Sequence, residues 1–116
     1  MSAFEDNSGK INSELFHEII ESQSGRQRKD VIMGPKFGVD TAVVDLGNGK
    51  GLATSSDPLS LIPSLGLKES AWLSVHLLVN DMVTTGFAPQ YVQFTLNLPT
   101  DFTLDNFKIY WGYIHR

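Results

Sequence analysis

Three acidic side chains, each in an otherwise apolar stretch, are the residues of this chain whose type and spacing suggest chemistry. Asp40 opens one apparent strand, Asp57 closes another, and Asp81 lies near the end of an apolar helix. Isolated carboxylates are costly to bury as charges, and a shared divalent cation removes that cost. Magnesium favours a few carboxylates together with phosphate oxygens. The pattern therefore suggests a magnesium–phosphate site.

Each acid also has a structural explanation. Asp57 before Pro58 is a common turn initiator, and Asp40 suits a cap for the bend that follows Gly38. Asp81 differs, because a carboxylate on a buried helix needs a stronger partner than an amide. Taken singly, the structural roles of Asp40 and Asp57 are at least as good as a site role. Considered together with Asp81, the three acids favour a metal-site role over three separate structural roles.

The helix that contains Asp81 also carries a polar strip. His76, Asn80 and Thr84 fall on one arc of it, with Asp81 beside them. Such residues on an apolar helix need partners, and for His76 we favour a structural hydrogen bond to Asn80 over a site role. The glycine-rich run 47–51 lacks the Walker arrangement before a helix, so we interpret it as a hairpin turn.

Composition describes one ordinary globular domain and excludes several classes of function. The chain has 116 residues, 41% of them hydrophobic, and a net charge of −4. The chain has no stripe of basic residues, so nothing suggests nucleic acid as a partner. We interpret the basic run over residues 26–29 as a solvated loop. The absence of cysteine excludes disulfides, thiol catalysis and cysteine-based zinc sites. Without a membrane-length apolar run or a signal-peptide pattern, we expect a cytoplasmic protein with no membrane partner.

The elements that must position the acids follow from periodicity and turn residues. After a loose tail over residues 1–10, the first half of the chain predicts a helix, a short strand and a β-hairpin, over residues 12–21, 31–33, 41–46 and 52–57. Gly47 to Gly51 supply residues that accept positive φ in the hairpin turn. Asn12 or Ser13 can cap the helix.

The second half predicts a helix, a strand and a helix, over residues 69–85, 90–98 and 103–116. The first of these helices is apolar almost all round, which predicts burial on most sides. The strand alternates apolar and polar residues. The last helix has one apolar stripe, made of Leu104, Phe107, Trp111 and Ile114. Because this stripe runs up to the final residues, we expect a domain cut from a longer protein. The predicted fold is α+β, with a mainly antiparallel or mixed four-stranded sheet and helices on one face.

Three motifs resemble the N-terminal domain of the aminoimidazole ribonucleotide synthetase superfamily. This superfamily includes thiamine-monophosphate kinase, selenophosphate synthetase and the hydrogenase-maturation protein HypE. The motifs are Gly38-Val-Asp40-Thr-Ala-Val-Val, Ala53-Thr-Ser-Ser-Asp57-Pro58 and Asn80-Asp81-Met-Val-Thr-Thr-Gly86-Phe-Ala-Pro89. The family patterns are Gly-Asp-Asp-Ala-Ala, Thr-Thr-Asp, and Asn/Ser-Asp followed by Gly-Ala-x-Pro. Their order and spacing fit from about residue 34 to residue 116, and synthetase-related proteins are the nearest match.

The resemblance implies a single ATP-binding domain whose sheet closes against a second protomer to form a dimeric β-barrel. It implies ATP and magnesium as cofactors, with Asp40, Asp57 and Asp81 as metal ligands and Asn80 with Asp81 in the nucleotide site. It identifies no catalytic residue. Val39 stands where the family has the first acid of its Asp-Asp pair.

The function implied is phosphoryl transfer, or ATP-driven activation of an unknown small substrate, which needs charge neutralisation more than a protein nucleophile. The family's C-terminal catalytic domain is absent from this chain, so we expect the full-length protein to be the enzyme and this part alone to be inactive. One alternative is a dimerisation or regulatory module that keeps the fold without catalysis, which Val39 favours. Another is a metal-dependent hydrolase unrelated to ATP.

Overall fold

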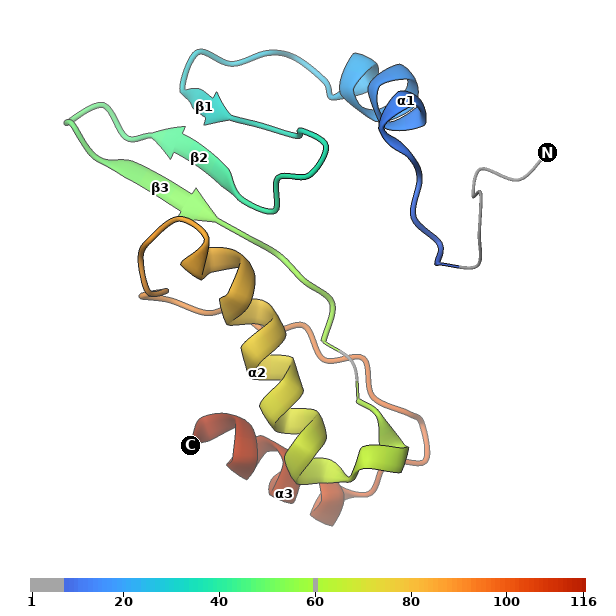
Figure 1. The fold of residues 1–116 in the computed structure, drawn as a ribbon. Coiled ribbons are helices and arrows are strands. Elements are labelled where there is room, and N and C mark those ends of the chain that lie inside the picture. The colour runs from blue at the N-terminus through green and yellow to red at the C-terminus, as the bar shows by residue number, and fades with distance from the viewer. Residues whose placement is uncertain (1–7, 60) are drawn as a thin grey trace. The chain divides into compact units, whose positions relative to one another are not determined.

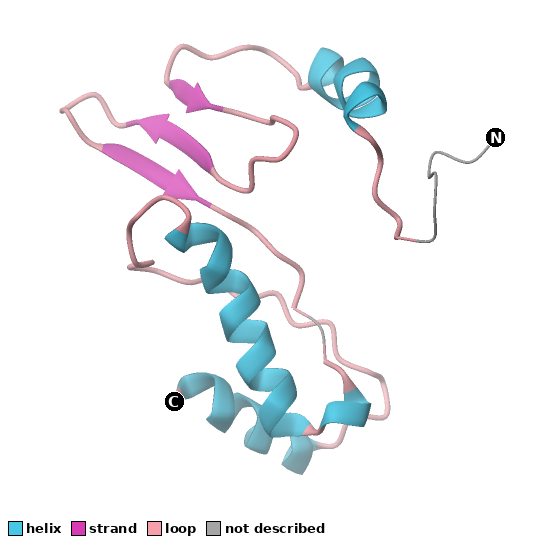
Figure 2. Cartoon of the chain, viewed as in Figure 1, coloured by secondary structure: helices cyan, strands magenta, loops and turns pink. Residues whose placement is uncertain are grey.

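The computed structural model describes residues 8–59 and 61–116 (Figure 1). The chain divides into two compact units, Met1–Thr54 and Ser55–Arg116. Helical segments precede and follow one antiparallel sheet in the chain (Figure 2). The predicted α+β class is therefore confirmed. Residues 1–7 of the predicted loose tail lie outside the described residues. Over the described residues, no helix combines the length and apolar character needed to cross a bilayer.

The first unit begins with an irregular helical segment at the position predicted for the first helix. One turn of α-helix, α1 (Ser13–Leu15), continues as a π-helix over Phe16–Ile20 and a 3-10 turn over Glu21–Gln23. Asn12 is the N-cap, because its side-chain oxygen accepts a hydrogen bond of 2.9 Å from the backbone N–H of Leu15. The predicted cap is therefore confirmed, whereas the regular α-helix expected over residues 12–21 is replaced by three helical types.

The sheet of the first unit has three antiparallel strands in the order β1 (Val31–Met33), β2 (Ala42–Asp45) and β3 (Gly51–Thr54). Strands β2 and β3 form the predicted hairpin. Its turn is closed by a hydrogen bond of 2.9 Å from the backbone N–H of Leu46 to the carbonyl of Lys50. Gly47 and Gly49 have φ of 83° and 76°, which residues with a Cβ rarely adopt. The glycine-rich run is thus a turn, as predicted.

The second unit is built on two helices, α2 (Leu67–Val83) and α3 (Leu104–His115), which pack against each other. Ala71 of α2 is fully buried. Ser74 and Tyr110 join the helices through a buried hydrogen bond of 3.0 Å between their hydroxyl oxygens. The core of this unit is therefore a helix–helix seam with one large aromatic side chain.

The strand predicted over residues 90–98 is absent, so the sheet has three strands instead of four. A strand exists only where its backbone pairs with a neighbouring strand, and this segment has no such neighbour among the described residues. The alternation is nevertheless visible in the burial of Phe94, Leu96 and Leu98, whereas the residues between them are exposed. Phe94 packs edge-on against Trp111 of α3, with ring centroids 5.9 Å apart. The alternating pattern thus reports contact with a helix instead of a place in the sheet.

The predicted burial of α2 on most sides is wrong for the unit as described. Trp72, Leu77 and Val83 are 58%, 48% and 49% exposed. A pair of packed helices can cover only one side of each other, and in α2 the fully buried residues are Ser70, Ala71 and Ser74. The stripe predicted on the last helix is likewise largely exposed. Tyr110, which sequence reasoning did not select, is the buried residue of α3.

Candidate functional site

Asp57 lies on the connection that enters the second unit. Strand β3 ends at Thr54, so the predicted strand over residues 52–57 is three residues too long and Asp57 stands outside the ladder. Pro58 restricts the backbone of the residue before it to extended conformations. Asp57 is half-buried. A carboxylate in this position has a restrained backbone without being part of the sheet.

Asp81 lies in the last turn of α2 and is also half-buried. It follows Ser74 by two helical turns and therefore lies on the same side of α2 as that buried serine. Two hydroxyl groups hold the end of the helix, since Thr84 Oγ1 donates to the carbonyl of Asp81 at 2.6 Å and Thr85 Oγ1 donates to the carbonyl of Met82 at 2.7 Å. The backbone that carries the carboxylate is thus well anchored.

The side chains of Asp57 and Asp81 meet in a carboxyl–carboxyl hydrogen bond. This bond is the main reason why the pKa of Asp81 is raised above its usual value; partial desolvation and repulsion by the charge of Asp57 add to it. The raised pKa means that Asp81 keeps its proton to a higher pH than an isolated aspartate does. The two acids thus interact, and their predicted convergence on a magnesium–phosphate site stays a prediction.

Asp40 belongs to the first unit, where it is exposed in the bend before β2. Gly38 has a φ of 75°, and the backbone N–H of Val39 donates to the carbonyl of Lys36 at 3.2 Å, so a turn precedes this acid. The bend that Asp40 was expected to cap is therefore present. Its approach to the carboxyl pair stays a prediction.

Asn80, predicted as a nucleotide contact, is exposed on α2. It lies about 100° around the helix from its neighbour Asp81, so the two side chains leave α2 in different directions. The hydrogen bond predicted between His76 and Asn80 is wrong. His76 Nδ1–H donates instead to the carbonyl of Trp72 at 2.8 Å, and the two rings stack with centroids 3.8 Å apart. The carbonyl one turn earlier is the nearest acceptor for a side chain that points back along the helix, and the spacing of four residues was the available signal.

The donor set of the pair fits magnesium bound together with phosphate. Within the described residues, no group of three or more histidine or acidic side chains gathers into a metal site. Magnesium does not require such a cage, because one or two carboxylates with phosphate oxygens and water complete its octahedron. Asp57 and Asp81 supply two interacting carboxyl groups, and a divalent cation would offset the repulsion between them when both are ionised. The pair therefore suits a cation that a phosphate ligand also holds.

Comparisons of this chain with protein-family models, with curated proteins and with solved structures find no match. The resemblance to the aminoimidazole ribonucleotide synthetase superfamily consequently rests on the three sequence motifs and stays a hypothesis.

Proposed function

We propose that this chain is the ATP- and magnesium-binding N-terminal domain of a cytoplasmic, ATP-dependent enzyme similar to the aminoimidazole ribonucleotide synthetase superfamily. The observation that supports the proposal is the hydrogen-bonded pair of Asp57 and Asp81. These acids come from two motifs far apart in the sequence, and each is the residue that the resemblance assigns to the metal. Their meeting is expected of a metal site and is not required by either structural explanation.

In this proposal the two carboxylates bind magnesium after Asp81 gives up its proton. Bound magnesium neutralises the charge of the phosphate oxygens, which is the main requirement of phosphoryl transfer. Asp81 contributes a ligand fixed to the end of α2, and Asp57 contributes one on a backbone restrained by Pro58. The motif match adds Asp40 as a third ligand and Asn80 as a nucleotide contact. The protein therefore holds and orients the phosphates, and no side chain acts as a nucleophile.

The proposal includes assembly of two copies through the sheet. In the dimeric barrel that the resemblance implies, residues 90–98 leave α3 and become the fourth strand, and the motif match is what supports this part of the proposal. Light scattering should then give the mass of a dimer. A species that stays monomeric at high micromolar concentration would contradict this part of the proposal.

A second candidate function is a dimerisation or regulatory module that does not bind nucleotide. The side chain of Val39 favours it, because this half-buried residue stands where the family has an acid and offers no oxygen to a metal. Thermal unfolding with and without magnesium–ATP separates the two candidates, since a ligand that binds only the folded state raises the melting temperature. A rise that requires both magnesium and ATP supports the enzyme domain. An unchanged melting temperature at millimolar nucleotide supports the module.

A further inference from the structure

One flank of α3 carries a narrow stripe of four exposed residues. Tyr110 defines the inner face, because its hydroxyl group bonds to Ser74 of α2. At about 100° per residue, Asp105, Ile109, Gly112 and Arg116 lie roughly 100° to 160° around the helix from Tyr110, on one flank of α3 and its C-terminal end, and all four are exposed. The stripe contains one large apolar side chain, Ile109, and two opposite charges, Asp105 and Arg116.

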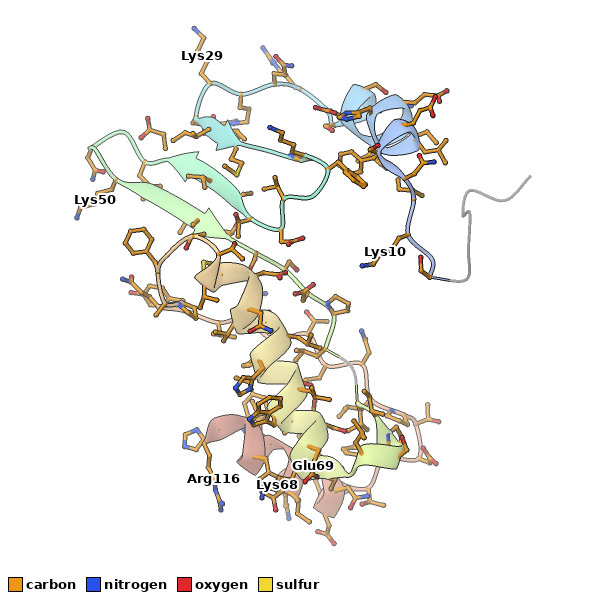
Figure 3. The ribbon with its side chains drawn as sticks, in the orientation of Figure 1. Lys10, Lys29, Lys50, Lys68, Glu69 and Arg116 are labelled. Atoms are coloured by element: carbon orange, nitrogen blue, oxygen red, sulfur yellow. The ribbon has the colours of Figure 1, made fainter. Side chains whose placement is uncertain are left out.

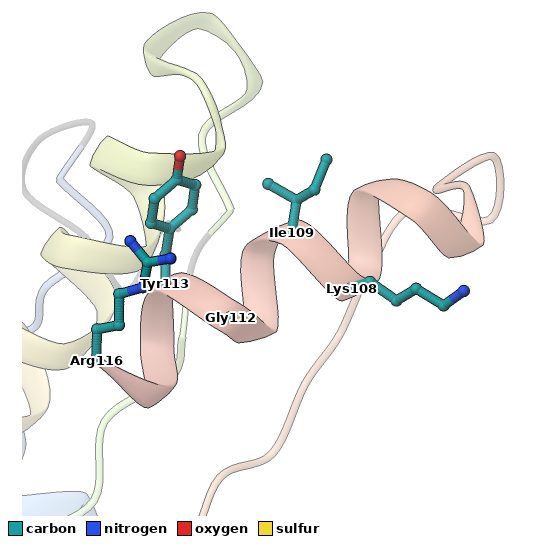
Figure 4. A pocket seen from close by; sticks show the side chains of 5 residues that line it. All are labelled: Lys108, Ile109, Gly112, Tyr113 and Arg116. Atoms are coloured by element: carbon teal, nitrogen blue, oxygen red, sulfur yellow. The ribbon is translucent and has the colours of Figure 1, made fainter.

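The middle of this stripe is hollow. A shallow groove of about 280 Å³ is lined by Lys108, Ile109, Gly112, Tyr113 and Arg116 (Figure 4). Except for Lys108, these residues have the spacing i, i+3, i+4 and i+7. Four residues so spaced form the hole that accepts one side chain from a facing helix in knobs-into-holes packing.

Glycine at position 112 is not required by the second unit itself. A Cβ built on Gly112 would meet no atom within 4 Å, and its φ is not positive. Glycine inside a helix lowers helix stability relative to alanine, so this position carries a cost that the unit does not explain. Close approach of another backbone or side chain is a usual reason for such a glycine.

The spacing of the stripe matches itself when a second copy of α3 is laid across it in the opposite direction. Ile109 and Gly112 lie equally far from the midpoint between residues 110 and 111, and so do Asp105 and Arg116. A two-fold axis through that midpoint therefore sets Ile109 opposite Gly112 and Asp105 opposite Arg116 at the same time. The Arg116 guanidinium lies over the Tyr113 ring, 5.8 Å from its centroid, which keeps the charge at the edge of the groove.

We propose that this face of α3 is a docking surface for a second copy of the same chain. In the antiparallel pair, Ile109 of each copy fills the Gly112 groove of the other, and Asp105 of each copy faces Arg116 of the other. The contact is isologous, so each favourable interaction occurs twice. One face of a 12-residue helix is a small interface, and the association is therefore weak and transient. This contact uses neither the carboxyl pair nor the sheet, so its test does not depend on the proposed function.

Charge reversal tests the pairing directly. Arg116→Glu and Asp105→Arg each place like charges opposite each other in a self-associated pair, and each should weaken self-association about tenfold in sedimentation equilibrium. An equimolar mixture of the two variants restores both opposite-charge contacts, and so does the double variant in one chain. Lys68→Glu, an equal charge reversal on the exposed first turn of α2 (Figure 3), is the matched control and should associate as the wild type does.

Filling the groove is the second test. Gly112→Leu should abolish the same association step while leaving the helical circular dichroism unchanged or stronger, because the new side chain meets open space within the unit. Wild-type association at millimolar concentration, loss in the single variants and recovery in the mixture support the docking surface. A mixture that associates no better than its components, or a wild-type protein in which none of these variants changes the mass, overturns it.

Discussion

Replacing Asp81 by asparagine should stabilise the metal-free protein near neutral pH. Asparagine has nearly the same shape as aspartate, carries no charge, and can donate a hydrogen bond to the carboxylate of Asp57. Two unit charges about 4 Å apart repel by about 1 kcal/mol in water. Because the pair is partly exposed, we discount this to about 0.5–1 kcal/mol. For a unit of this size, that corresponds to a rise of about 4 °C in the melting temperature.

The pH dependence of the stability has a defined sign. The pKa of Asp81 is raised in the folded state, so the fold binds this proton more tightly than the unfolded chain does. The resulting stabilisation is fully present below the ordinary aspartate pKa of about 4 and is lost as the pH rises through the raised pKa of Asp81. Wild-type stability should therefore fall across this window. Asp81→Asn should show no such fall from the pair.

Urea unfolding followed by circular dichroism at several pH values between about 4 and 8 measures this difference. Asp101→Asn is the control, because it removes an exposed aspartate of the same unit. The reasoning is refuted if Asp81→Asn is no more stable than the wild type near pH 7.5 and loses stability over the same pH range.

Two further predictions concern the packing of α3. Tyr110→Phe removes the buried hydroxyl group that bonds to α2, and it should cost about 1 kcal/mol of unfolding free energy. The control Tyr91→Phe, at a side chain that is 91% exposed, should cost nothing measurable. Equal losses of the two variants in chemical denaturation would argue against the contact between α2 and α3 as the core. Thr103→Ala removes the N-cap, whose hydroxyl oxygen accepts a hydrogen bond of 3.2 Å from Asn106 N–H, and should cost about 1 kcal/mol; Thr103→Ser retains the hydroxyl group and should behave as the wild type in the same assay.

The sequence predicted the elements whose structure depends on residues close together in the chain. The hairpin follows from glycines that adopt positive φ between two β-prone runs. The start of the first helical segment follows from Asn12, whose side chain accepts a backbone hydrogen bond as the N-cap. Each of these features depends on a few neighbouring residues, so a single sequence contains all the information that they need.

Features that depend on what packs against a segment were predicted poorly. Alternation over residues 90–98 indicates one covered face, but it does not tell whether a sheet or a helix such as α3 covers it. Tyr110 was missed because its partner Ser74 lies 36 residues away and neither residue stands out by type. The meeting of Asp57 and Asp81 was predicted because two separate motifs pointed to it, and their function as metal ligands stays a prediction.

Calorimetric titration with magnesium–ATP is the most direct test of the proposed function. The titrated proteins are the wild type, Asp81→Asn and the control Asp101→Asn. We expect the wild type and the control to bind with equal affinity, and Asp81→Asn to bind at least about tenfold more weakly, because a lost charged ligand costs 1.4 kcal/mol or more. Titration with ATP and excess chelator should show the metal dependence. Equal affinity of all three proteins for magnesium–ATP would contradict the proposal and leave Asp81 as a structural residue of α2.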